Sequence, residues 1–273
     1  MTRLHMNHPT VLLAMLAVVA TSIQGQATGN TAAKPPEATS VLLAELNKPD
    51  SSKRAVAYYR LIGAARRTEF ELNAAALTEK ALLDRASDRS AISNALIALL
   101  EREQKVTFSA AEGSLPEWYG DYIGDLIVSV GRLKSPSAVN ALLGFITTGG
   151  GAIDGLIDIG PTALPPLLRV VDSSDVMVRS SAAIALGRMA TRKAEIGLTA
   201  QQVTDIRAKL LAKLSDSQPN VRAGAIYGLR AFNDGVVRSA VLQLQQDSYS
   251  VGGAERRYPV RDAVKEWLRT HPN

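Results

Sequence analysis

The sequence predicts an all-α protein built from stacked pairs of helices. From Ser40 onward, apolar residues recur at intervals of three and four, and the breaks between these runs contain Pro, Gly, Asp and Ser. No segment shows the alternation expected of a strand. Only 5% of the residues are aromatic and there is no cysteine, which disfavours a β-sandwich and excludes a disulfide framework.

The N-terminal residues of the chain indicate export. Residues 1–27 contain a positive charge at Arg3, an apolar run over 11–20 and small residues up to Ala27, as in a secretory signal peptide. The run is shorter than the roughly 20 apolar residues of a membrane-spanning helix. Residues 28–39 read as a flexible linker. We therefore expect a periplasmic or secreted protein that is soluble after cleavage, with an uncleaved N-terminal anchor as the alternative.

Helices are expected along the rest of the chain, and they divide it into two regions. Residues 40–112 should form N-terminal helical hairpins and residues 113–273 a repeat array. Pro136 and Pro219 suit first-turn positions, where a missing N–H costs nothing. The expected helices cover 40–47, 52–66, 69–86, 88–104, 117–133, 136–146, 151–159, 162–171, 176–190, 200–214, 219–232, 235–246 and 259–269.

Internal repetition is the most specific signal in the array. Three helices begin with Val-Arg, followed by a small apolar residue three positions after the arginine and a leucine seven positions after it. The arginines are Arg179, Arg222 and Arg261. A leucine pair and a short acidic turn precede the first two copies. Residues 40–105 show helical pairs without this signature.

With these motifs, the chain resembles HEAT-repeat proteins, in particular the short bacterial PBS-lyase HEAT-like type. The resemblance implies antiparallel helix pairs stacked into an α-solenoid whose second helices line the concave side. It also implies that the repeated arginines bond acidic or carbonyl groups of the adjacent repeat, which we favour over an anion-binding ladder. Residues 191–201 interrupt the repeat spacing and should form a protruding loop.

The residue inventory argues against catalysis. Cysteine is absent, and after export the remaining histidine is His271, which we expect to be frayed and solvated near the C-terminus. The pairs Asp121 with Asp125 and Asp154 with Asp158 could bind Ca²⁺ or act as acid and base, but such pairs are common on solvated helices. No catalytic residue, metal ligand or cofactor is predicted. Basic and acidic residues are interleaved, which disfavours nucleic acid, and no later segment suits a membrane.

Five residues are candidates for contact with a partner. Trp118 and Tyr122 belong to an aromatic cluster that could stack on a ligand, or could instead fill the junction between the two regions. Arg188, Tyr227 and Arg230 lie off the apolar faces of second helices. We expect an exported, non-catalytic scaffold that binds a protein or peptide. The alternative is an enzyme or small-ligand binder that uses a carboxylate and aromatic groove.

Overall fold

A computed structural model describes residues 37–64, 73–110, 114–252 and 256–272. Every named element in these ranges is a helix, and one isolated antiparallel bridge joins Val251 to Arg257. The all-α prediction is therefore confirmed for the described residues. The proposed signal peptide and most of the linker lie outside them. Contacts divide the chain into two compact units, with the boundary in the sequence between Leu133 and Lys134.

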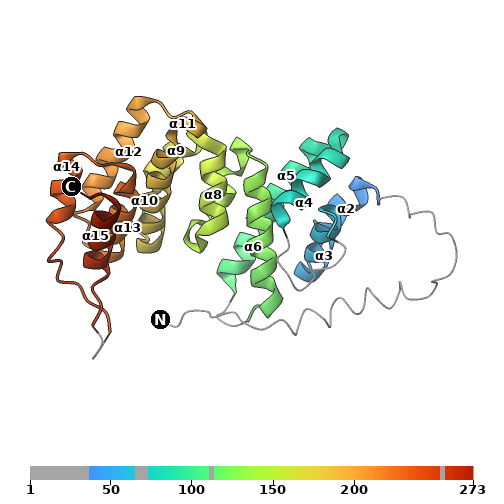
Figure 1. Cartoon of the computed structure of the whole chain (residues 1–273). Helices are drawn as coiled ribbons and strands as arrows, with labels where there is room; N and C mark the ends of the chain where they lie inside the picture. Colours follow the sequence, from blue (N-terminus) through green and yellow to red (C-terminus); the bar gives the residue numbers. More distant parts are fainter. Residues whose placement is uncertain (1–36, 65–72, 111–113, 253–255, 273) are drawn as a thin grey trace. The chain divides into compact units, whose positions relative to one another are not determined.

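The first unit contains five α-helices within its described residues (Figure 1). The Asp50 carboxylate caps α3 by accepting hydrogen bonds from the N–H groups of Ser52 and Lys53. Helix α6 packs against both α4 and α5. The helices are α2 (Thr39–Glu45), α3 (Ser51–Leu61), α4 (Ala74–Asp84), α5 (Arg89–Ser109) and α6 (Glu117–Arg132), with a 3₁₀ turn at Ala86–Asp88.

The second unit follows the expected helices closely, because prolines and aspartates fix several helix starts. Pro219 occupies the first turn of α13, and the Asp175 carboxylate accepts hydrogen bonds from two N–H groups at the start of α10. The helices are α7 (Val139–Leu143), α8 (Gly150–Ile159), α9 (Leu164–Val170), α10 (Val176–Thr191), α11 (Lys193–Ile196), α12 (Ala200–Lys213), α13 (Pro219–Gly228), α14 (Gly235–Leu242) and α15 (Pro259–Thr270), with 3₁₀ turns at Pro136–Ala138, Ile146–Thr148, Gly160–Ala163 and Leu229–Ala231.

The segment expected to protrude as a loop packs back onto its own unit. Residues 193–196 form the short helix α11, which contacts α8. A side chain at Gly160 would place its Cβ 3.3 Å from the carbonyl oxygen of Ile196, so the two segments are in close contact. The expectation of a protruding loop was wrong, because the insertion contains a helix turn and an apolar residue that can pack.

In the second unit, the second helices of three consecutive pairs pack against one another. Helix α10 packs mainly on α13, and α13 packs on α15, while α9 and α12 contact their own second helices (Figure 1). The α10–α13 approach depends on glycine, because a Cβ at Gly187 would lie 2.1 Å from the Cα of Gly228. Consecutive helix pairs that stack in this way form an α-solenoid.

The first unit contains a copy of the repeat turn that the Val-Arg motif does not mark. Arg54 of α3 donates from Nη1 to the carbonyl oxygens of Lys48 and Pro49, at 2.9 and 2.6 Å. These acceptors precede the arginine by six and five residues. Arg179 of α10 makes the same two bonds to carbonyls six and five residues before it. The turn between α2 and α3 is therefore bonded by its arginine in the same way as the turns before α10 and α13.

A signal for this copy was present in the sequence. An aspartate precedes Arg54 by four positions and a leucine follows it by seven, as around Arg179. Lys53 stands where the later copies have valine, so a search for Val-Arg does not find it.

Candidate partner-binding surface

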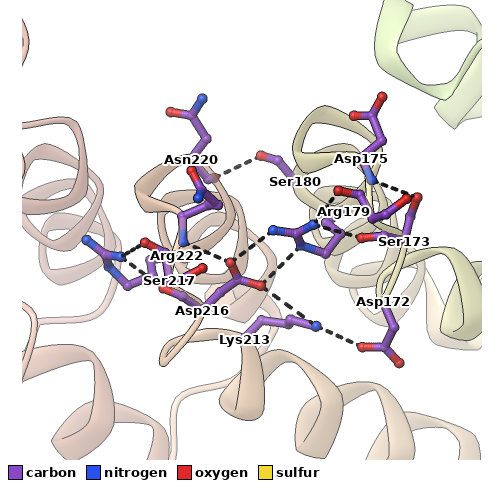
Figure 2. Close-up of polar contacts among 12 residues, drawn as sticks. Asp172, Ser173, Asp175, Arg179, Ser180, Lys213, Asp216, Ser217, Asn220 and Arg222 are labelled. Atoms are coloured by element: carbon purple, nitrogen blue, oxygen red, sulfur yellow. Dashed lines mark hydrogen bonds and ion pairs between the residues drawn. The ribbon is translucent and has the colours of Figure 1, made fainter.

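The repeated arginines form a ladder that joins consecutive repeats (Figure 2). Arg179 donates from Nη1 to the carbonyl oxygen of Ser173 in its own turn, at 2.7 Å. Its Nε and Nη2 donate to the two carboxylate oxygens of Asp216 in the next turn, at 3.2 and 3.3 Å. Each arginine thus has one side for its own turn and one for the next.

Arg222 repeats this arrangement one step further along the chain. Its Nη1 donates to the carbonyl oxygen of Asp216 at 2.9 Å, and its Nε donates to the carboxylate of Asp247 at 2.8 Å. Burial raises the pKa of Asp216, but the Gln218 N–H and the Arg179 guanidinium outweigh it, so the pKa lies below its ordinary value. The prediction that the repeated arginines bond acidic or carbonyl groups of adjacent turns is confirmed for Arg179 and Arg222.

The three candidates on second helices are accessible. Tyr227 of α13 is 39% exposed, and the guanidinium carbon of Arg230 lies 5.0 Å from its ring centroid. Arg230 forms an ion pair with Glu266 of α15, with Nη2 and Oε1 2.9 Å apart. The Arg269 guanidinium, with Arg230 contributing, lowers the pKa of Glu266 to about 2, so this carboxylate stays charged.

Arg188 is placed by a second ion pair, on the α8 side of α10. Its guanidinium contacts the carboxylate of Asp154, and both side chains are about half exposed. Met177 of the same helix is also exposed. The exposed residues of α10 and α13 therefore include aromatic, thioether and guanidinium groups, which are enriched at protein–protein interfaces. The ion pairs hold the arginines in place, so less side-chain entropy is lost on binding.

Trp118 and Tyr122 are internal residues of the first unit. Their side chains are 8% and 0% exposed, and the rings contact each other with centroids 6.2 Å apart. The Tyr122 hydroxyl donates to Oε1 of Glu103 at 3.2 Å, and burial raises the pKa of Tyr122. Neither residue can reach a partner in this structure. The aromatic rings fill the interior of the first unit because helix α6 turns this face toward α3 and α5.

A buried ion pair that the sequence did not indicate lies beside these rings. Arg54 and Glu103 are 2% and 0% exposed, with contacts of 2.5 Å between Nε and Oε1 and 2.9 Å between Nη2 and Oε2. The Tyr119 hydroxyl donates to Oε2 of Glu103 at 2.6 Å. Glu103 thus supplies Arg54 with the carboxylate that Asp216 supplies to Arg179.

The paired carboxylates are largely used within the fold. Asp154 contacts Arg188, and Asp158 forms an ion pair with Arg192 at 2.8 Å. Asp125 accepts a hydrogen bond from the Tyr59 hydroxyl at 2.8 Å. Among the described residues, no group of three or more His, Asp or Glu side chains is arranged to hold a metal ion.

His271 is packed rather than frayed, which corrects our expectation. Its ring stacks on Trp267 with centroids 4.2 Å apart, Nδ1 lies 2.8 Å from the Trp267 carbonyl oxygen, and Nε2 lies 3.1 Å from that of Arg230. These contacts therefore hold the end of α15 against the 3₁₀ turn that follows α13.

In the part of the chain that the structure describes, no helix is both long and apolar enough to cross a membrane.

No family model matches the sequence, and no curated protein matches it. A designed armadillo repeat protein in complex with the peptide (KR)4 is 15% identical, with 84% of this chain and 98% of that chain covered and a TM-score of 0.45. Another designed armadillo repeat protein is 16% identical over the same shares, with a TM-score of 0.44.

Human deoxyhypusine hydroxylase in complex with glycerol is 15% identical, with 85% of this chain and 95% of that chain covered and a TM-score of 0.24. TM-scores this low carry no argument about fold or function. The repeat architecture rests instead on the helix contacts and the arginine ladder within this chain.

Proposed function

We propose that this chain is an exported HEAT-type scaffold that binds a protein or peptide partner through the exposed face of its second helices. Arg188, Tyr227 and Arg230 are the proposed contact residues. The observation that carries the proposal is the position of Tyr227, which stays exposed on α13 while Arg230 stacks against it and Glu266 holds Arg230. An exposed aromatic ring beside a fixed arginine is a typical anchor at an interface.

The HEAT-type assignment is supported by the pattern of the turns. The Val-Arg motif, the aspartate in the turn and the glycines of α10 and α13 coincide with arginines that bond their own turn and the next. This is how consecutive pairs of short helices can be held in one register.

Export rests on the sequence of the N-terminus. We propose that residues 1–27 are a signal peptide, that 28–39 form a linker, and that hairpins over 40–112 precede a repeat array over 113–273. Expression of the whole chain in bacteria, followed by fractionation and intact-mass measurement, tests the first step. A soluble periplasmic or secreted product shortened at its N-terminus is expected, and an uncleaved membrane-bound product would contradict it.

The alternative function, an enzyme or small-ligand binder, depended on a groove of carboxylates and aromatic rings. Trp118 and Tyr122 are buried, while Asp154 and Asp158 form ion pairs with arginines. Because these side chains are buried or paired, they favour binding of a partner on the surface over catalysis or small-ligand binding at those residues. The proposal includes no cofactor.

Site-specific photo-crosslinking tests the proposed surface. A photoreactive phenylalanine analogue replaces Tyr227 in one variant and Val236 in a control, since Val236 is 62% exposed but lies on the first helix α14. Incubation with an extract of the producing cells should give a crosslinked protein or peptide from position 227 and none from position 236. Tyr227→Ala, with an unchanged melting temperature, should remove the same partner from affinity capture.

Equal capture by Tyr227→Ala and the unmodified protein would contradict the proposed surface, and so would equal crosslinking from both positions.

A further inference from the structure

Equivalent positions of the repeat place three half-buried or exposed side chains in a row on the second-helix face. Five residues after the repeated arginine, α10 has Ile184, α13 has Tyr227 and α15 has Glu266. Helix α10 packs on α13 and α13 packs on α15, so equivalent positions of consecutive second helices are neighbours. An aliphatic, an aromatic and an acidic side chain therefore follow one another across this face.

The carboxylate at the acidic end of this row is shared by two arginines. Arg269 binds both oxygens of Glu266, because its Nε donates to Oε2 and its Nη2 donates to Oε1, each at 2.8 Å. Arg230 reaches only Oε1, with its Nη2 2.9 Å away. The bidentate contact is the stronger geometry, so Glu266 mainly neutralises Arg269. At neutral pH, two guanidinium groups and one carboxylate leave an excess positive charge in this cluster.

Arg230 is the member of this cluster with unused donors. Its Nε is buried and has no acceptor among the described residues, where its guanidinium contacts no carboxylate other than Glu266. The Tyr227 ring, whose centroid is 5.0 Å from the guanidinium carbon, keeps the group in place. The side chain is 36% exposed, so a partner can reach it. A positioned cation with unused N–H groups is complementary to a carboxylate.

The α10 end of the row has no such excess of charge. Arg188 faces one carboxylate, that of Asp154, and the neighbouring exposed position of α10 is the aliphatic Ile184. The face is therefore apolar and balanced in charge over α10 and α13, and positive at the boundary between α13 and α15. This pattern suits a ligand with an apolar group at one end and an acidic group at the other.

We propose that the partner of the second-helix face carries an acidic side chain that binds Arg230 and, two residues away, an apolar side chain that packs on Tyr227 and Ile184. Residues two apart in an extended segment point to the same side at a spacing of about 7 Å, which suits the adjacent Tyr227 and Arg230 groups. This inference rests on the proposed function and names the chemical class of its partner, an extended protein segment with alternating acidic and apolar side chains.

Fluorescence anisotropy with the purified protein and labelled peptides tests the carboxylate contact. One peptide repeats Leu-Gly-Glu-Gly, and its uncharged control repeats Leu-Gly-Gln-Gly. At low ionic strength the Glu peptide should bind about tenfold more tightly than the Gln peptide, as expected for one charge-assisted contact. Arg230→Gln should reduce this preference to about twofold or less. The matched control is Arg169→Gln, an exposed arginine on the first helix α9, which should leave the preference within about twofold of its original value.

A second variant, Glu266→Gln, gives a prediction of opposite sign and covers the case in which Arg230→Gln does not fold. Without Glu266, the carboxylate of the peptide no longer competes with one from the chain. The affinity for the Glu peptide should therefore rise about threefold to tenfold, while that for the Gln peptide stays within about twofold. A carboxylate that only maintained the structure of the site would have the opposite effect on binding.

The proposal is overturned if the Glu and Gln peptides bind equally, if Arg169→Gln and Arg230→Gln reduce the preference equally, or if Glu266→Gln weakens binding of the Glu peptide. Its failure is distinguishable from that of the proposed function. Crosslinking of a partner from position 227 together with equal binding of the two peptides would overturn this inference and leave the proposed surface intact. Equal crosslinking from positions 227 and 236 would overturn the proposed surface itself.

Discussion

The contact between α10 and α13 allows one substitution to be worked through in detail. In Gly187→Ala, the new Cβ would lie 2.1 Å from the Cα of Gly228 and 2.2 Å from its carbonyl oxygen. Carbon atoms pack at about 3.5–4.0 Å, so the helices must separate by roughly 1.5 Å. The obstructing atoms belong to backbone, which cannot rotate away as a side chain could.

Two effects of opposite sign decide the result. Replacing a helix glycine by alanine favours the helix by about 1 kcal/mol. Overpacking a core costs about 1–3 kcal/mol, and contact with backbone places this case at the upper end. The expected net loss is about 2 kcal/mol, or roughly 8 °C in the melting temperature of a unit of this size.

Tryptophan fluorescence makes the assay specific for each unit. The chain has 2 tryptophans, Trp118 in the first unit and Trp267 in the second. In a Trp118→Phe background, thermal unfolding followed at Trp267 reports on the unit that contains Gly187. The control is Gly124→Ala in α6 of the first unit, followed at Trp118 in a Trp267→Phe background. A Cβ at this position meets no atom within 4 Å, so the stability of the first unit should rise by about 0.5–1 kcal/mol.

The reasoning is refuted if Gly187→Ala leaves the second unit as stable as before or stabilises it. That outcome would mean that helix propensity outweighs the contact. A similar loss for Gly124→Ala would instead show that glycine is required for a reason other than space.

Two further predictions concern charged groups. Glu103→Gln leaves the buried Arg54 guanidinium without its counter-charge, so the free energy of unfolding measured by chemical denaturation should fall by about 3–5 kcal/mol. The control Glu101→Gln, on the exposed face of the same helix, should change it by less than about 0.5 kcal/mol. Equal effects of the two variants would contradict the importance of the Arg54–Glu103 pair. The pKa of Asp216 is lowered on folding, so its contribution is present above the ordinary value of 3.8 and is lost as the pH falls through the folded value. The difference in melting temperature between the unmodified protein and Asp216→Asn should therefore shrink between about pH 6 and pH 3, and a difference that grows on acidification would show that the carboxylate does not stabilise the turn.

Local signals explain how much of this structure was predictable. The spacing of apolar residues, first-turn prolines and capping aspartates are signals that act within a few residues. The expected helices therefore matched the observed ones, except that their ends differ and that α11 was not expected. The exposure of Arg188 and Tyr227 also followed from their positions opposite the apolar face of their own helices.

Contacts between distant segments could not be read in the same way. The spacing of apolar residues along α6 did not show whether Tyr122 faces solvent or the interior, because an aromatic ring can lie on either side of an amphipathic helix. Glu103 is the partner of Arg54 across 49 residues, a separation at which spacing carries no information.

By itself, the sequence determined that this protein is helical, that its C-terminal part repeats, and that its charged second-helix residues lie off the core. The tertiary structure decided which of those charges are already paired. Arg179 and Arg222 each bind a carboxylate from a later segment of the chain, whereas Arg261 donates from Nε to the carbonyl oxygen of Asp247. Identical local motifs therefore differ in their contacts, because a hydrogen bond needs a partner that only the arrangement of neighbouring segments can supply.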